Sequence, residues 1–242
     1  MSQAIVIIPT YNEKENVERM IRKVVSLALP LHILIVDDNS PDGTRDIVKK
    51  LQIEFPNLHL LERAGKQGLG TAYIAGFKWC LAREYEYIFE MDCDFSHNPD
   101  DLLNLYHTCT TAPADMVVGS RYVNGVNVVN WPMSRVILSY YASMYVRIIT
   151  GMSIRDTTSG FVCYHRRVLE KLNLDAIKFK GYAFQIEMKF KAWRSGFDIK
   201  EESIIFTDRK EGQSKMSGGI IKEALFGVLE LKIKSVLGIL KI

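Results

Sequence analysis

The chain has 242 residues, of which 48% are hydrophobic and 24% are charged, and its formal net charge at pH 7 is +3. This composition is ordinary for a globular protein with a full hydrophobic core, and we expect one large α/β domain with a small appendage. The four cysteines are scattered without C-x-x-C spacing, which argues against a zinc site and against a disulfide framework.

Charge and hydropathy also limit the classes of function. Residues 207–242 hold seven Lys/Arg and four Asp/Glu, a difference of +3 that equals the charge of the whole chain. Because the excess basicity lies in this segment and no DNA- or RNA-binding motif accompanies it, we expect no nucleic-acid partner. The first residues, "MSQAIVIIPTYN", do not resemble a signal peptide. No uncharged apolar run reaches the roughly 18 residues that span a bilayer, so we expect a cytoplasmic protein.

Short apolar runs alternate with helix-period segments over the first half of the chain. Strands are predicted at residues 4–9, 32–36, 58–62, 85–91 and 115–119. Helices are predicted between them, at residues 17–24, 47–55, 68–82 and 100–109. This alternation is typical of an α/β fold with a mostly parallel central sheet and helices on both faces.

Polar sequences follow four of the predicted strands. They are "PTYNE" (9–13), "VDDNS" (36–40), "MDCD" (91–94) and "GSR" (119–121). Ligands of such sheets bind outside the carboxyl ends of the strands, so we expect a ligand site along this edge. Asp92 and Asp94 could hold a divalent cation such as Mg²⁺ or Mn²⁺. Acidic pairs at strand ends also form turns or helix N-caps, and the following "NPDD" (98–101) looks like a helix start.

The pattern changes from about residue 120. A long apolar and aromatic helix is predicted at residues 134–150, a second helix at 182–193, a strand near 201–206 and a basic loop at 207–219, whereas residues 155–166 receive no assignment. A final helix carries a polar stripe of Glu223, Gly227, Glu230, Lys234, Gly238 and Lys241 beside apolar residues. It could lie at a membrane interface or dock on its own domain. We therefore divide the chain into a main α/β domain, residues 1–217, and a C-terminal amphipathic helix, residues 218–242.

A set of motifs in a fixed order carries a resemblance to a known family. They are "IPTYNEKENV", "IVDDNSPDGT", "GKQGLGTAY", "MDCDFSHNP", "VVGSRYV", "TSGF" and "RKEGQSKMS". Together they resemble the inverting glycosyltransferases of family 2, and most closely the dolichyl- or polyprenyl-phosphate mannosyltransferases. The resemblance runs from about residue 5 to about residue 220 and implies a GT-A fold. The C-terminal transmembrane helices of some members are missing here.

The resemblance implies a role for residues of the strand ends and the Gly-rich loop. Nucleotide-sugar contacts would come from Pro9, Tyr11, Glu13, Asp37, Asp38, Lys66, Gly70, Asp92 and Arg121, with Gly68 beside them. Asp92 and Asp94 would be the DXD motif that holds Mg²⁺ or Mn²⁺ against the donor diphosphate. Some relatives place a further glutamine ligand where Ser96 stands, so either Ser96 or water could complete the ion's shell. On the residues alone, Asp37 and Asp38 could instead belong to a loop, with Asp42-Gly43 as its turn.

The resemblance also implies the acceptor side. Catalysis would involve Asp94, Arg121, Arg209 and Lys215, and acceptor-phosphate binding would involve Arg135, Ser214, Arg209 and Lys215. Arg135 could merely open its helix. The implied reaction moves mannose from GDP-mannose to a polyprenyl phosphate in a membrane. A UDP-glucose-dependent glucosyltransferase and a glycan-elongating enzyme remain alternatives.

The acceptor decides whether a catalytic base is needed. A phosphate monoester has its second pKa near about 6 and is already anionic, whereas a sugar hydroxyl needs a base. Asp156 and Glu187 are the acids available for that task, and for Glu187 we favour a structural or sugar-contacting role. We also expect peripheral association with the cytoplasmic face of a membrane, with residues 136–146 as a second lipid-facing candidate. A small membrane protein is a candidate partner.

Overall fold

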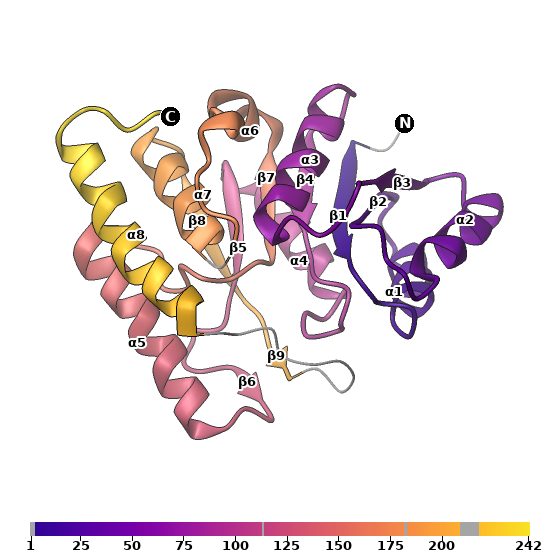
Figure 1. Ribbon diagram of the computed structural model, residues 1–242, viewed down its shortest axis with the longest axis horizontal. Coiled ribbons are helices and arrows are strands. Elements are labelled where there is room, and N and C mark those ends of the chain that lie inside the picture. Colours follow the sequence, from indigo (N-terminus) through magenta and orange to yellow (C-terminus); the bar gives the residue numbers. More distant parts are fainter. Residues whose placement is uncertain (1–2, 113, 182, 209–217) are drawn as a thin grey trace.

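The computed structural model describes residues 3–112, 114–181, 183–208 and 218–242, and its centre is a seven-stranded sheet (Figure 1). The strands are β1 (Ala4–Thr10), β2 (Leu31–Asp37), β3 (Leu58–Glu62), β4 (Tyr87–Glu90), β5 (Met116–Ser120), β7 (Val162–His165) and β8 (Ile199–Ser203). Their order in the sheet is β3-β2-β1-β4-β7-β5-β8. All neighbouring pairs are parallel except those of β7, which runs antiparallel to both β4 and β5. The predicted mostly parallel sheet is thus confirmed.

The sequence predicts no strand at residues 155–166, yet this segment supplies β7 in the middle of the sheet. Val162, Cys163 and Tyr164 are all fully buried, so the strand has no polar alternation that would reveal it. The strand expected near 201–206 is divided in two. β8 ends at Ser203, and β9 (Phe206–Thr207) pairs with β6 (Val128–Val129) in a small second sheet.

Helices cover both faces of the sheet, as the alternation of buried side chains along β1 requires. Val6 and Ile8 pack in one hydrophobic cluster with α1 (Val17–Val25), α2 (Thr44–Glu54) and α4 (Asp101–Thr111). Ile5 and Ile7 pack in the other, with the remaining long helices. These are α3 (Leu69–Leu81), α5 (Met133–Thr150), α6 (Arg166–Lys171), α7 (Ala183–Arg194) and α8 (Gly218–Val236), and a short 3₁₀ turn, Leu174–Ala176, precedes α7.

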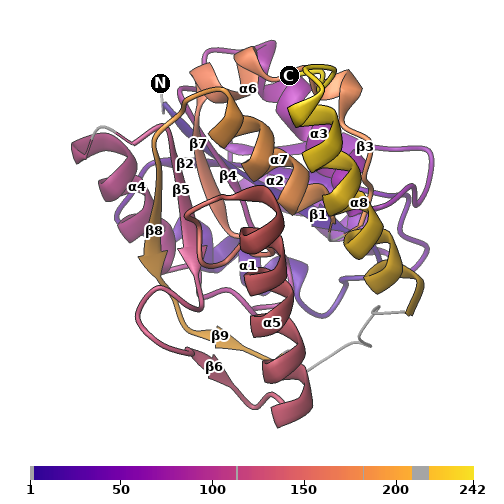
Figure 2. The same ribbon diagram turned by 90° about the vertical axis from the view of Figure 1, so that its left-hand side faces the viewer.

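The last helix, α8, lies beside α5 at the end of the molecule opposite α1 and α2 (Figures 1 and 2). The Tyr145 hydroxyl of α5 donates to the Leu225 carbonyl at 3.0 Å, and Val228 and Leu231 are buried. At Gly227 a Cβ would lie 2.5 Å from the Phe179 ring, so this glycine allows close packing on the loop before α7. The helix therefore docks on its own domain. The proposed domain division at residue 217 stays a prediction.

The opposite side of α8 and the outer side of α5 are apolar and exposed. On α8 the exposed fractions of Phe226, Ile233 and Val236 are 72%, 57% and 74%. On α5 those of Tyr141 and Ile148 are 56% and 72%. Across the described ranges, no helix is both long enough and apolar enough to cross a membrane.

Candidate active site

A cavity of about 400 Å³ lies at the carboxyl edge of β1, β2 and β4. Of the residues that the sequence singled out, it brings together Pro9, Tyr11, Glu13, Asp38, Lys66, Gly68, Asp92 and Asp94. The register explains the grouping, because Thr10 of β1 pairs with Asp37 of β2, and Ile7 of β1 pairs with Glu90 of β4. Parallel neighbouring strands thus end side by side, and the polar residues that follow them share one space.

The turn after β4 fixes the orientation of Asp94. Its carboxylate is 9% exposed, and Oδ1 accepts hydrogen bonds from the Ser96 amide at 3.1 Å and the Ser96 hydroxyl at 2.5 Å. Phe95 between them has a φ of 57°, a left-handed conformation that costs a bulky residue about 1–3 kcal/mol. Ser96 thus holds the Asp94 carboxylate in place, a role that the sequence prediction of a metal ligand did not include.

Asp92 stands beside Asp94 on the cavity wall. The Tyr73 hydroxyl of α3 donates to Asp92 Oδ1 at 3.4 Å, and burial together with the nearby Asp92 charge raises the pKa of Tyr73. Carboxylate oxygens on a tight turn are hard donors of the kind that Mg²⁺ and Mn²⁺ prefer. The donor set therefore fits a divalent cation of this class.

The second acidic pair divides into two roles. Asp37 is fully buried, and its carboxylate accepts from the Thr10 hydroxyl at 2.9 Å, the Ser40 hydroxyl at 2.6 Å and the Ser40 amide at 2.9 Å. These bonds join the ends of β1 and β2, and Asp37 does not line the cavity. Asp38 does line it and contacts Arg63 at 3.0 Å, while burial raises the pKa of Asp38. The expected turn is present, since Asp42 accepts from the Thr44 amide at 3.0 Å.

The Gly-rich loop has one conformational glycine and one packing glycine. Gly68 has a φ of +106°, which L side chains rarely adopt, and it lines the cavity. At Gly70, a Cβ would lie 2.7 Å from Cγ of Phe184 in α7, so helix packing accounts for this glycine. Gly70 is not among the residues that line the cavity.

Cations line the cavity from two directions. The Lys66 ammonium lies 4.8 Å from the centre of the Tyr11 ring. Lys180 reaches the cavity with Gly181 from the segment before α7, and the Lys180 carbonyl accepts from the Gly70 amide at 2.9 Å. Lys180 and Arg63 are not among the residues predicted from the sequence. A Lys-Gly pair just before a predicted helix was the signal for Lys180, but it carries little information without the fold.

The arginine after β5 is paired inside the protein. Arg121 Nε and Nη2 each donate to a different oxygen of Asp156 at 2.7 Å, and the Arg121 amide adds a bond of 3.0 Å. Both side chains are at least nine-tenths buried. Burial alone would raise the pKa of Asp156, but the Arg121 charge and hydrogen bonds lower it. Asp156 is thus an ionised partner of Arg121.

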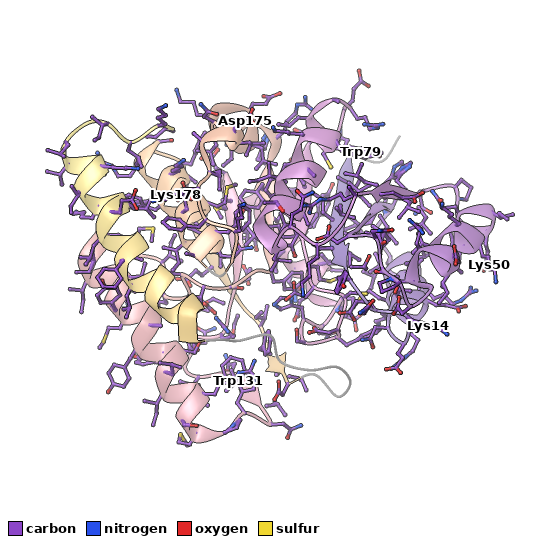
Figure 3. All side chains as sticks on the ribbon, viewed as in Figure 1. Lys14, Lys50, Trp79, Trp131, Asp175 and Lys178 are labelled. Atoms are coloured by element: carbon purple, nitrogen blue, oxygen red, sulfur yellow. The ribbon has the colours of Figure 1, made fainter. Side chains whose placement is uncertain are left out.

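Two guanidinium groups contact one indole ring on this side of the molecule. Cζ of Arg135 lies 4.0 Å from the centre of the Trp131 ring, and Cζ of Arg121 lies 5.5 Å from it. Arg135 is the third residue of α5 and forms an ion pair with Asp208 at 2.7 Å. Trp131 projects near β9 in Figure 3. Arg209, Ser214 and Lys215 lie outside the described residues.

Glu187 and its surroundings form a further polar group in the second half of the chain. The buried Glu187 carboxylate accepts from the amides of Lys178 at 2.9 Å and Phe179 at 3.1 Å, and it pairs with Lys191 at 3.0 Å. These contacts fix the loop before α7. The geometry agrees with the structural role that we favoured for Glu187.

A buried polar chain connects α7 to β4. The Glu90 carboxylate accepts from Gln185 Nε2 at 2.7 Å, and burial raises the pKa of Glu90 to about 8. Lys189, one turn further along α7, donates to the Ser159 carbonyl at 2.6 Å, and burial lowers its pKa to about 8. The sequence predictions do not include this chain. Its signal is that Glu187, Lys189 and Lys191 alternate with apolar residues in the middle of α7.

The chain is similar to proteins of known family and fold. The family model described as "Glycosyl transferase family 2" matches residues 5–173. A polyprenol monophosphomannose synthase of Mycolicibacterium smegmatis is 46% identical over 96% of this chain and 88% of its own length. An undecaprenyl-phosphate mannosyltransferase of Micrococcus luteus is 45% identical over 93% of this chain and 92% of its own length.

Solved structures share the fold at low identity. Glucosyl-3-phosphoglycerate synthase from Mycobacterium tuberculosis, in complex with Mn²⁺, UDP and glucosyl-3-phosphoglycerate, aligns with a TM-score of 0.66 and 16% identity over 98% of this chain and 81% of that chain. A mannosyltransferase from Pyrobaculum calidifontis, in complex with GDP-Man and Mn²⁺, aligns with a TM-score of 0.61 and 17% identity. The alignment covers 97% of this chain and 64% of that one. The expected GT-A fold is confirmed.

Proposed function

Because the chain belongs to glycosyltransferase family 2, we propose that it is an inverting enzyme that transfers mannose from GDP-mannose to a polyprenyl phosphate, giving polyprenyl-phosphate-mannose and GDP. The observation that carries the proposal is the pair of curated relatives. Both are at least 45% identical over at least 93% of the chain, and both names combine mannose transfer with a polyprenyl phosphate.

The donor occupies the cavity beside β1, β2 and β4 in this proposal. Asp92 and Asp94 hold Mg²⁺ or Mn²⁺, and the ion when bound neutralises charge on the leaving diphosphate. Tyr11, Glu13 and Asp38 line the cavity, and their rings and carboxylates suit contacts with the nucleoside. Lys66 and Lys180 supply positive charge for the phosphates.

The acceptor phosphate lies beside Trp131, where Arg121 and Arg135 meet. Guanidinium groups suit phosphate oxygens because each carries five N–H donors, so Arg121 and Arg135 can keep their aspartates and still donate to a phosphate. Asp156 fixes the plane of the Arg121 guanidinium through its own bidentate contact. We assign Arg209, Ser214 and Lys215 to the same phosphate by resemblance.

The reaction is one in-line displacement. A phosphate oxygen of the acceptor attacks the anomeric carbon, the bond from that carbon to the diphosphate oxygen breaks, and the configuration inverts. The acceptor is already anionic at neutral pH, so no side chain has to remove a proton. This agrees with the ion-paired state of Asp156 and with the hydrogen-bonded state of Glu187, because neither carboxylate is available as a general base.

The acceptor lies in a membrane, so the enzyme has to work at a lipid surface. The exposed apolar sides of α5 and α8 suit that contact, and we place them at the cytoplasmic face. A small membrane partner protein stays a prediction.

The test is transfer of radiolabelled sugar to a short polyprenyl phosphate in the presence of Mg²⁺ or Mn²⁺. We expect butanol-extractable label from GDP-mannose, little label from UDP-glucose, and no transfer after chelation with EDTA. If lipid-linked label appears with UDP-glucose but not with GDP-mannose, the donor is UDP-glucose and the proposed donor is wrong. Protein that binds GDP-mannose yet labels no lipid acceptor would overturn the proposed reaction and favour glycan elongation.

A further inference from the structure

A second, smaller cavity lies against the outer side of α5. It measures about 170 Å³ and is lined by Tyr122, Tyr140, Met144, Arg147 and Arg155. Tyr140, Met144 and Arg147 follow one another at spacings of four and three, so they lie on one face of the helix. None of the five residues lines the donor cavity. This is a separate site, which we call the flank pocket.

Two arginines give the flank pocket its charge. Arg147 and Arg155 are both exposed, and among the residues described neither forms an ion pair with a carboxylate. Arg155 Nη1 donates to the Val123 carbonyl at 2.7 Å, which fixes its guanidinium at the pocket. By contrast, Arg121 and Arg135 are each paired with an aspartate. The flank pocket therefore presents positive charge to a ligand.

The size of the pocket suits one anionic group. Its 170 Å³ is less than half of the 400 Å³ of the donor cavity, which leaves room for a phosphate group but not for a nucleotide sugar. Guanidinium groups prefer phosphate and carboxylate oxygens, with which they form bidentate contacts. We take the ligand group to be a phosphate.

The surroundings indicate that the phosphate belongs to an amphiphile. Tyr140 and Met144, which line the pocket, are 43% and 37% exposed, and Tyr141 and Ile148 beside them are 56% and 72% exposed. Apolar side chains next to a cationic pocket match a lipid, whose charged headgroup is joined to acyl chains. A free phosphate ion would make no use of this apolar border.

We propose that the flank pocket binds the phosphate headgroup of an anionic phospholipid and so seats α5 in the membrane surface. This inference rests on the proposed function, because only a membrane-borne acceptor requires the enzyme at a lipid surface. The pocket adjoins the acceptor region, since the Tyr122 ring lines it and also lies 5.2 Å from Cζ of Arg121. A headgroup there would hold the acceptor side of the enzyme against the bilayer.

The test compares binding to phosphatidylcholine vesicles with and without phosphatidylglycerol, measured by co-sedimentation. Each cation at an anionic surface strengthens binding by about 1 kcal/mol, or about fivefold. We expect Arg147→Gln to weaken binding to the anionic vesicles about fivefold and the Arg147→Gln/Arg155→Gln variant on the order of 25-fold. Binding to phosphatidylcholine alone should not change.

The matched control removes two exposed lysines at the other end of the molecule. Lys14 and Lys50 are labelled in Figure 3 beside α1 and α2, far from α5, and Lys14→Gln/Lys50→Gln makes the same change in net charge. If this control loses as much binding to the anionic vesicles as the double arginine variant, net charge alone explains the binding and the flank pocket is not a specific site. The single variant Arg147→Gln should stay folded, because among the described residues the Arg147 side chain has no hydrogen bond to lose. Weaker binding by this variant therefore reports on the pocket and not on unfolding.

Activity separates this inference from the proposed function. With a short, water-soluble polyprenyl phosphate and no vesicles, Arg147→Gln should transfer mannose with an unchanged KM for the acceptor. A raised KM would mean that the pocket takes the acceptor's own phosphate, which overturns the inference. A wild-type chain that prefers anionic vesicles but transfers no mannose would refute the proposed function and leave the lipid site standing.

Discussion

At the carboxyl end of β4, Asp92 and Asp94 face a cavity, whereas at the carboxyl end of β5, Arg121 is held in a buried ion pair with Asp156. Both turns lie on the same edge of one sheet. The turn after β4, on the proposed donor side, presents carboxylates that a cation can bind. The turn after β5, on the proposed acceptor side, fixes its cation with a carboxylate of the protein. Position on the edge of the sheet brings charged residues near a ligand. How strongly each charge acts on that ligand then depends on the residues of the same chain with which it pairs.

The largest expected effect is on the donor side. Asp94→Asn keeps the hydrogen bond with Ser96 but removes the charge, so we expect kcat/KM to fall at least about 1000-fold, or about 4 kcal/mol of barrier. The melting temperature should stay within a few degrees, because the side chain faces a cavity. Asp46→Asn, at an exposed site on α2, is the control and should retain activity. Activity within tenfold of wild type would contradict the assignment of Asp94.

The acceptor side should respond mainly in stability. Asp156→Asn leaves the Arg121 guanidinium buried without its carboxylate, and we expect a loss of about 3 kcal/mol in the free energy of unfolding by urea. The double variant Arg121→Met/Asp156→Asn should recover part of this loss, since neither charge of the pair remains. A loss below about 0.5 kcal/mol, the usual range of a surface substitution, would show that the ion pair is not buried in solution.

Substitution of Gly70 tests whether this glycine serves helix packing or nucleotide binding. In Gly70→Ala the new methyl group meets the Phe184 ring, and overpacking of this kind costs about 2 kcal/mol. Gly65→Ala is the matched control, because a Cβ there meets nothing within 4 Å. If both variants are equally stable and Gly70→Ala instead raises the KM for GDP-mannose, the glycine serves the nucleotide rather than the helix packing.

Ser96 offers a smaller effect on the donor side. Ser96→Ala removes the hydroxyl that orients the Asp94 carboxylate, and losing one such hydrogen bond should lower kcat/KM about tenfold. Ser96→Thr should restore most of the activity, because it keeps the hydroxyl. A Ser96→Thr variant as poor as Ser96→Ala would indicate that space in the turn, rather than the hydrogen bond, sets the rate.

The smallest expected effect is a difference between Asp38 and Asp156 in how their contributions to stability depend on pH. Burial raises the pKa of Asp38 above its ordinary value, whereas Arg121 lowers that of Asp156 against the effect of burial. Asp156 therefore contributes stability that is present above its unfolded pKa of about 3.9 and is lost as the pH falls through its folded pKa. Asp38 acts in the opposite sense, since its contribution is lost as the pH rises from that unfolded pKa through its raised folded pKa. Carbon-detected NMR titration should find the pKa of Asp38 above the ordinary value for aspartate and the pKa of Asp156 below it. The reverse order of the two pKa values would contradict this prediction.

Much of the donor side could be predicted from local sequence. Buried apolar runs marked five parallel strands, and acids placed just after such runs had to lie on one edge. The position of Asp92, Asp94 and Asp38 at this edge followed from that pattern alone, whereas their roles stay predictions. Asp37 has the same local context as Asp38, yet it bonds to Thr10 and Ser40, and only the juxtaposition of β1 and β2 reveals these partners.

The acceptor side was less predictable because its contacts are distant in sequence. Asp156 lies 35 residues from Arg121, and Asp208 lies 73 residues from Arg135. Nothing in either local pattern shows that these charges will meet. The strand β7 was missed for a related physical reason, since burial on both faces removes the polar alternation by which a strand is recognised.

The antiparallel strand β7 also sets the spacing of the site. It lies between β4 and β5, so the carboxyl ends of these two strands are two strand spacings apart, or roughly 9.5 Å. Hydrogen bonds across a continuous sheet keep that spacing constant. The strands that precede Asp94 and Arg121 therefore move together as parts of one sheet, and β7 sets the distance between their carboxyl ends.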